Sequence, residues 1–210
     1  MTKEILCFGD SNTWGFNPID ATRYTREARW PGVAQAALGE GWRMIEEGLN
    51  GRTTVFEDEI EPGRRGFSSI IMLLETHMPL DLVILMLGTN DTKTRYGATV
   101  RDISLGWLKL AKAIRERCLW FPYPPPKILL AVPPPVLDCP NLTESFEGAP
   151  EKSAHFAEVG RQIAEANDLL FFDCGTVIQS SPVDGIHLSP ESHKALGLAM
   201  AGFLRRSMAG

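Results

Sequence analysis

The chain has 210 residues, which is long enough for one sizeable hydrophobic core, and we expect a single domain spanning residues 1–210. Hydrophobic residues make up 44% and charged residues 22%, as in ordinary soluble globular proteins. The net charge of −5 argues against a basic face that binds nucleic acid.

The apolar runs of the chain are all short. The run near Met1 is too short for a signal peptide, and no run is long enough to cross a bilayer. We therefore expect a cytoplasmic protein with no membrane partner. The four cysteines are widely spaced and form no Cys-x-x-Cys pair, so we expect reduced, mostly buried thiols rather than disulfides or a metal site.

Strand-like and helix-like patterns alternate along the chain. The strands are predicted at 5–8, 42–46, 82–87, 127–132 and 169–172. The helices are predicted at 30–38, 67–77, 103–117, 151–167 and 190–206. Ser189 should cap the last helix, with Pro190 at its first position. Such alternation predicts a parallel sheet covered by helices on both faces.

Sites in sheets of this type form in the loops at the carboxyl ends of the strands. The loops at 9–29, 48–66, 88–100 and 133–150 are therefore the places to look for chemistry. Gly9-Asp10-Ser11 directly follows the first strand, where small residues let a serine side chain stand clear of the sheet edge. The tripeptide is also typical of a helix N-cap or a phosphate-binding turn, and both readings stay open for it alone.

Asp184-Gly185-Ile186-His187 lies just before the last predicted helix. An Asp three residues before a His can hold one imidazole nitrogen, which leaves the other nitrogen free to accept a serine proton. The alternative is a turn in which the Asp caps the backbone and the His lies at the surface.

Two further loops carry candidate hydrogen-bond donors. Asn90, in Gly88-Thr89-Asn90-Asp91, can donate its amide hydrogens to a developing oxyanion, while Asp91 is better suited to cap or brace the loop. The alternative for this block is a simple polar turn. Gly51 can offer a backbone N–H with no side chain in the way, or it can simply be a turn glycine with positive φ. Together with the serine and the Asp/His pair, these residues supply every role of a covalent acyl-transfer site.

These blocks resemble those of the SGNH (GDSL-type) hydrolase family, in the family's order and over nearly the whole chain. The stretches 3–15, 45–54, 80–93 and 183–188 are similar in detail to the arylesterase and acyltransferase (perhydrolase) branch. The resemblance implies a three-layer α/β/α sandwich with a flavodoxin-like parallel sheet of about five strands. One departure is Asn12, which stands where the family name expects Leu and could reshape the pocket mouth.

The resemblance also implies roles for individual residues. Ser11 would be the nucleophile, His187 the general base and then acid, and Asp184 the residue that orients His187. The oxyanion hole would consist of the Ser11 and Gly51 backbone N–H groups and the Asn90 side chain. No cofactor and no metal are implied, and the zinc, P-loop and dinucleotide motifs are missing from the sequence.

Three residues near Ser11 are candidates for lining the substrate pocket: Asp10, Asn12 and Trp14. Asp10 is expected to brace the loop, and Trp14 either walls the acyl pocket or packs in the core. Phe146, Phe156 and Trp120 are candidates for an apolar entrance or a subunit contact. The remaining histidines lack a carboxylate at useful spacing and are taken as surface or helix residues: His77, His155 and His193.

The residues predict ester hydrolysis through an acyl-enzyme. The resemblance implies small substrates, aryl or short-alkyl esters with a short acyl group, and acyl transfer to alcohols or peroxide as a second activity. The alternatives within the family are a carbohydrate acetyl esterase, a thioesterase or a lysophospholipase. A remoter one is a flavodoxin-like binding module in which the 9–15 turn holds a phosphate. The loops at 16–29 and 133–150 are long for simple connections. In the branch that this chain resembles, similar loops can shape the pocket by meeting a neighbouring subunit, so the resemblance implies a homo-oligomer.

Overall fold

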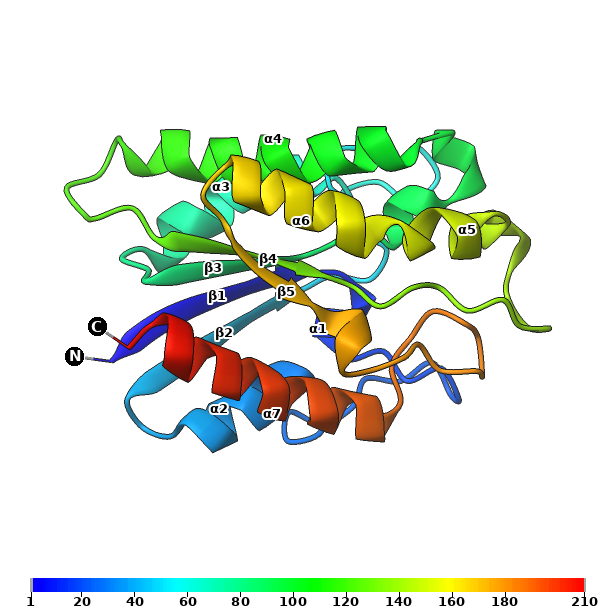
Figure 1. Ribbon diagram of the computed structural model, residues 1–210, viewed down its shortest axis with the longest axis horizontal. Helices are drawn as coiled ribbons and strands as arrows, with labels where there is room; N and C mark the ends of the chain where they lie inside the picture. Colours follow the sequence, from blue (N-terminus) through cyan, green and yellow to red (C-terminus); the bar gives the residue numbers. More distant parts are fainter. Residues whose placement is uncertain (1, 210) are drawn as a thin grey trace.

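Residues 2–209 are described by a computed structural model in which five strands form one parallel sheet (Figure 1). The strands are β1 (Lys3–Gly9), β2 (Trp42–Gly48), β3 (Leu82–Met86), β4 (Lys127–Val132) and β5 (Leu170–Asp173). Their order in the sheet is β2-β1-β3-β4-β5, which is the flavodoxin-type, doubly wound order. The predicted fold class is confirmed.

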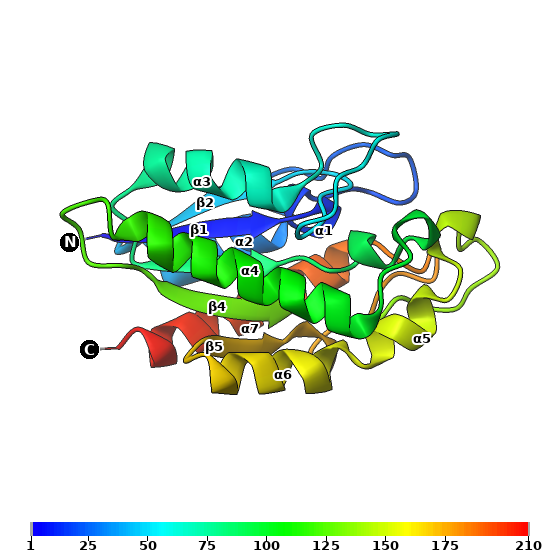
Figure 2. The same cartoon turned by 90° about the horizontal axis from the view of Figure 1, so that it is seen from above.

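Helices cover both faces of the sheet. Helices α2 (Trp30–Leu38) and α7 (Pro190–Ser207) lie on one face, and α3 (Gly66–His77), α4 (Val100–Cys118) and α6 (Phe156–Ala166) lie on the other (Figure 1 and Figure 2). Two short helices, α1 (Ser11–Trp14) and α5 (Ala149–Ala154), lie near the carboxyl ends of the strands. The N-cap predicted for α7 is confirmed, because Ser189 Oγ accepts from Ser192 N at 3.2 Å.

The core consists of two layers because successive side chains of a strand point to opposite faces. In β1, Leu6 and Phe8 belong to the cluster under α3, α4 and α6, whereas Ile5 and Cys7 belong to the cluster under α2 and α7. All four are fully buried. Burial on both faces explains why the central strands are continuous apolar runs instead of alternating ones.

One predicted helix is interrupted in the structure. The pattern over 151–167 predicted a single helix, but α5 ends at Ala154, α6 begins at Phe156, and His155 joins them. The Ser153 hydroxyl donates to Ala149 O at 2.7 Å and accepts from Val136 N at 2.8 Å. A serine that bonds back to its own helix and to a loop bends the helix locally, which a hydrophobic pattern does not reveal.

Within residues 2–209, no helix is both long and apolar enough to span a membrane. The four cysteines are free, and three of them, Cys7, Cys118 and Cys174, are buried. In the same part of the chain, no group of three or more His, Cys, Asp or Glu side chains is placed to hold a metal ion.

Candidate active site

Ser11 begins α1 directly after β1, at the carboxyl edge of the sheet. Asp10 caps this short helix, since its Oδ1 accepts from Asn12 N at 2.9 Å, and Gly15 ends it in the left-handed region at φ 90°. Gly9 is required for close packing, because a Cβ there would lie 2.1 Å from Thr13 Oγ1. The turn thus raises the Ser11 hydroxyl out of the end of β1, although the residue is only 6% exposed.

His187 lies in the loop before α7 and faces Ser11. Its Nε2 is 3.0 Å from Ser11 Oγ, and its Nδ1 is 2.5 Å from Asp184 Oδ2. When Nδ1 carries the proton and donates to Asp184, Nε2 is free to accept the Ser11 hydroxyl proton. The sequence motifs at residues 9–11 and 184–187, far apart in the chain, therefore meet in one hydrogen-bonded row.

Asp184 holds the backbone of this loop as well as the imidazole. Its Oδ1 accepts from the N–H groups of Ile186 and His187, both at 3.0 Å. Burial alone would raise the pKa of Asp184, but the hydrogen bonds from the His187 side chain and from these two N–H groups lower that pKa below its ordinary value. The carboxylate therefore stays ionised beside His187.

Asn90 is hydrogen-bonded to Arg52, the residue that follows Gly51 in the loop after β2. Asn90, at the start of the short helix η1 (Asn90–Thr92), donates from Nδ2 to Arg52 O at 3.1 Å. Gly51 has φ +76°, and a Cβ there would lie 3.2 Å from Glu61 Oε2, so it is a left-handed turn glycine, and its role as an N–H donor to the oxyanion stays a prediction. One amide hydrogen of Asn90 is left for a further acceptor.

Arg52 organises the site, and sequence reasoning did not single it out. The residue is 5% exposed, its Nη1 donates to Gly9 O at 2.8 Å, and its guanidinium lies 4.2 Å from the centroid of the Phe8 ring. Burial lowers the pKa of Arg52 to about 10. Its carbonyl accepts from Asn90, so Arg52, in the loop after β2, connects the end of β1 with the loop after β3.

Asp91 braces the loop after β2, as its position in the motif suggested. Its carboxylate accepts from Thr54 N at 3.0 Å and also from the Thr54 hydroxyl. Burial raises the pKa of Asp91 to about 6, against the lowering effect of these hydrogen bonds. Asp91 is fully buried, and it connects the loop after β3 to the loop after β2.

The three residues expected around the nucleophile have different surroundings. Asp10 is 1% exposed, and burial raises its pKa to about 6 although the Asn12 N–H, His187 and Arg52 oppose the shift. Asn12 is 2% exposed, and its Nδ2 donates to Ile186 O at 3.3 Å. Trp14 is half-buried with the Arg23 guanidinium 4.9 Å from its ring centroid. That any of the three lines a substrate pocket stays a prediction.

Two of the remaining histidines lie in helices, as expected, but with partners that the sequence did not indicate. His193 lies in α7 as expected but is fully buried, not at the surface, and its Nδ1 accepts from Trp30 N at 3.3 Å. Burial lowers the pKa of His193 to about 4. His77 has a carboxylate partner after all, because its Nε2 lies 2.8 Å from Glu47 Oε1 on the neighbouring strand. Only His155 is exposed as predicted.

The aromatic residues proposed for an apolar entrance are scattered. The prediction for Phe156 is wrong, because this residue is 1% exposed and packs edge-on against Trp107 in the core, with ring centroids 5.3 Å apart. Trp120 is 78% exposed and follows the C-terminal end of α4, at the other end of the sheet from Ser11. Phe146 is buried in a small cluster with Val136, Ala149 and Ile186, behind the loop that carries His187.

Phe16 is a site residue that the sequence did not indicate. Its half-buried ring lies against the imidazole of His187, with the ring centroids 4.2 Å apart. Its backbone N–H donates to Ser11 O at 3.0 Å. The residue follows α1 within a long irregular loop, where no periodic pattern predicts which side chain turns inward.

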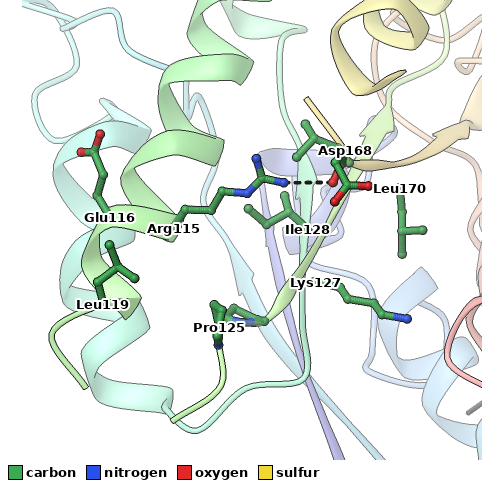
Figure 3. Close-up of a pocket in the computed structure, with 10 residues that line it drawn as sticks. Arg115, Glu116, Leu119, Pro125, Lys127, Ile128, Asp168 and Leu170 are labelled. Atoms are coloured by element: carbon green, nitrogen blue, oxygen red, sulfur yellow. Dashed lines mark hydrogen bonds between the residues drawn. The ribbon is translucent and has the colours of Figure 1, made fainter. Parts of the chain in front are cut away.

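A groove of about 650 Å³ lies at the amino ends of β4 and β5, away from Ser11 (Figure 3). Arg115 crosses it and donates from Nη2 to Asp168 O at 2.9 Å, and Ile128 and Leu170 lie beneath (Figure 3). The groove contains none of the residues of the Ser11 site, and it is not where ester chemistry is to be sought.

Comparison with known proteins agrees with the fold and the motifs. The profile of the GDSL-like lipase/acylhydrolase family matches residues 7–195. The aryl esterase of M. smegmatis is 40% identical, with 98% of this chain and 99% of that chain covered and a TM-score of 0.94. A carbohydrate acetylesterase from Sinorhizobium meliloti is 39% identical, with 98% and 100% covered and a TM-score of 0.95. No curated protein sequence matches the chain.

The chain therefore belongs to the GDSL-like lipase/acylhydrolase family. It is a carboxylic ester hydrolase of the serine esterase class, built on a five-stranded parallel sheet.

Proposed function

We propose that the protein hydrolyses small carboxylic esters through an acyl-enzyme formed on Ser11. The observation that carries the proposal is the row of hydrogen bonds from Ser11 Oγ to His187 Nε2, at 3.0 Å, and from His187 Nδ1 to Asp184, at 2.5 Å. His187 takes the Ser11 proton as Oγ attacks the acyl carbonyl. It then gives that proton to the leaving alcohol, and Asp184 stabilises the imidazolium between the two steps.

The second half-reaction reverses these roles. Water attacks the acyl-enzyme carbonyl and gives a proton to His187, which returns it to Ser11 Oγ as the acid leaves. In both tetrahedral intermediates the negative oxygen would accept from the backbone N–H groups of Ser11 and Gly51 and from Asn90 Nδ2. The hydrogen bond from Asn90 to Arg52 O supports this role, because it fixes the amide before substrate arrives.

The substrates are proposed to be aryl or short-alkyl esters of short acyl groups. The similarity to an aryl esterase supports this class, and the similarity to a carbohydrate acetylesterase makes acetylated sugars the second candidate. Rates on a panel of aryl acetates, acetylated sugars, thioesters and lysophospholipids separate the candidates. A kcat/KM that is highest on acetylated sugars would transfer the proposal to the second class.

Water need not be the sole acceptor of the acyl group. Any alcohol or peroxide that reaches the acyl-enzyme carbonyl and can give its proton to His187 completes the same cycle. With an activated ester and added alcohol, a share of the acyl groups should appear as the new ester, rising with alcohol concentration. Formation of the free acid alone, across several soluble alcohols, would make the protein a plain hydrolase.

The protein is further proposed to be one domain, a cytoplasmic enzyme and a homo-oligomer. The last point is supported by the loops at 16–29 and 133–150, which are long for simple connections between elements. Light scattering after size exclusion measures the assembly directly. A mass equal to one chain at micromolar concentration would contradict it.

The test of the esterase proposal is hydrolysis of an aryl acetate by the protein and by Ser11→Ala. The wild-type protein should turn over the ester, and the folded variant should retain only the background rate. Turnover by a folded Ser11→Ala protein at near the wild-type rate would remove Ser11 from the mechanism.

A further inference from the structure

We propose that Asn12 is a positioning residue that holds His187 within hydrogen-bond reach of Ser11. The inference rests on the triad mechanism proposed above and adds to it a residue outside the triad. Asn12 stands where a leucine gives the family its name, so the contact described here comes from a departure of this chain.

The peptide unit between Ile186 and His187 is held at both of its polar atoms. Its carbonyl oxygen, on Ile186, accepts from Asn12 Nδ2 at 3.3 Å. Its N–H, on His187, donates to Asp184 Oδ1 at 3.0 Å. A peptide group is planar, so bonds to both atoms fix its rotation and hence the direction in which the His187 side chain leaves the backbone.

Asn12 lies in the same turn as the nucleophile. Its own N–H donates to Asp10 Oδ1 at 2.9 Å, and its side chain is 2% exposed. Within residues 2–209, hydrogen bonds join the 10–15 turn to the 184–188 loop at two places, the Ser11–His187 bond itself and the Asn12–Ile186 bond. The Asn12–Ile186 bond therefore helps to keep His187 Nε2 within hydrogen-bond distance of Ser11 Oγ, the two atoms between which the proton would pass.

The other polar atom of the Asn12 amide favours a role in catalysis over one in stability. Asn12 Oδ1 is buried and has no hydrogen-bond partner among the described residues, a state that costs free energy. A leucine would fill a similar volume without that cost. What the amide supplies and leucine cannot is the donor to Ile186 O.

The experiment compares Asn12→Asp, which keeps the shape but loses the donor, and Asn12→Leu with a neighbouring control. The control is Thr13→Val, in the same buried turn, because the Thr13 hydroxyl has no partner among the described residues. We expect kcat on an aryl acetate to fall about tenfold in both Asn12 variants, with KM changed by less than about twofold. The reason is that a less firmly positioned His187 slows the proton-transfer step more than it weakens substrate binding. Thr13→Val should match the wild-type protein. An unchanged kcat in a folded Asn12 variant would overturn the inference.

A second measurement asks whether the effect runs through His187. In a His187→Ala background, Asn12→Asp should cause no further loss of the residual rate, because there is no imidazole left to position. The same tenfold loss in that background would show a general distortion of the site and overturn the inference. If Ser11→Ala keeps the wild-type rate, the proposed triad mechanism itself is wrong. If turnover depends on Ser11 but is unchanged in the Asn12 variants, only the inference about Asn12 is overturned.

Discussion

The ring of Phe16 lies against the imidazole of His187, with centroids 4.2 Å apart and planes inclined by 31°. The same residue donates its N–H to Ser11 O at 3.0 Å, so Phe16 contacts the His187 imidazole through its ring and the Ser11 turn through its backbone. An aromatic face attracts a cation, and in the proposed mechanism His187 becomes a cation when it takes the Ser11 proton. The contact would therefore favour the imidazolium that this mechanism requires.

Replacing Phe16 with leucine tests that contact. Phe16→Leu should lower kcat by about threefold to thirtyfold, the range expected from the loss of a cation–π contact at a partly exposed site. Phe16→Tyr keeps the aromatic face and serves as the matched control. Stopped-flow or steady-state rates on an aryl acetate give the comparison, and equal kcat values in the two variants would show that the ring only fills space.

Asn90 should act on the transition state more than on substrate binding. Its Nδ2 is fixed by Arg52 O and has a second hydrogen for the oxyanion. Asn90→Ala should therefore lower kcat by about 10²–10³ with a smaller change in KM. Thermal unfolding of the variant controls for loss of the bond to Arg52. A variant that raises only KM would make Asn90 a binding residue.

The sheet and the order of the site motifs could be predicted from sequence because both are local patterns. Continuous apolar runs predicted the buried strands, and the polar residues after each run predicted loops. A parallel sheet brings these loops together at one edge. Helix ends were less well predicted: α4 begins at Val100, earlier than the predicted 103, because Thr99 and Asp102 form a capping box.

The residues that the sequence did not reveal act across long distances in the chain. Arg52 reaches Gly9 O, and Phe16 reaches His187, and no spacing encodes either contact. His193 is different, because the pattern did contain the signal. It lies three, four and seven residues before the buried Leu196, Gly197 and Met200, the spacing of one helical face. The interpretation of His193 as a surface or helix residue did not use this spacing.

The buried His193 predicts a pH dependence of stability. Its pKa falls from 6.5 to about 4 on folding, so the unfolded chain binds the proton first as the pH drops. The stability that neutral His193 contributes is present above about pH 6.5 and is lost as the pH falls toward 4, by up to about 3 kcal/mol. Asp10 and Asp91, whose pKa values are raised, act in the opposite direction over a similar range.

The comparison with His193→Gln isolates the histidine, since both carboxylates remain in the variant. Urea unfolding between pH 7 and 4.5 should give the wild-type protein the steeper loss of unfolding free energy as the pH falls. Parallel curves for the two proteins would mean that His193 binds its proton equally well in the folded and unfolded chains.

Covalent labelling tests most directly whether Ser11 is an activated nucleophile. A fluorophosphonate should inactivate the protein, and peptide mass mapping should place the phosphonyl group on Ser11 alone. Ser11→Ala should take up no label, and Asp184→Ala should be labelled much more slowly, because His187 loses the carboxylate that orients it. An active protein that is not labelled, or one inactivated by a label on another residue, would contradict the assignment of Ser11.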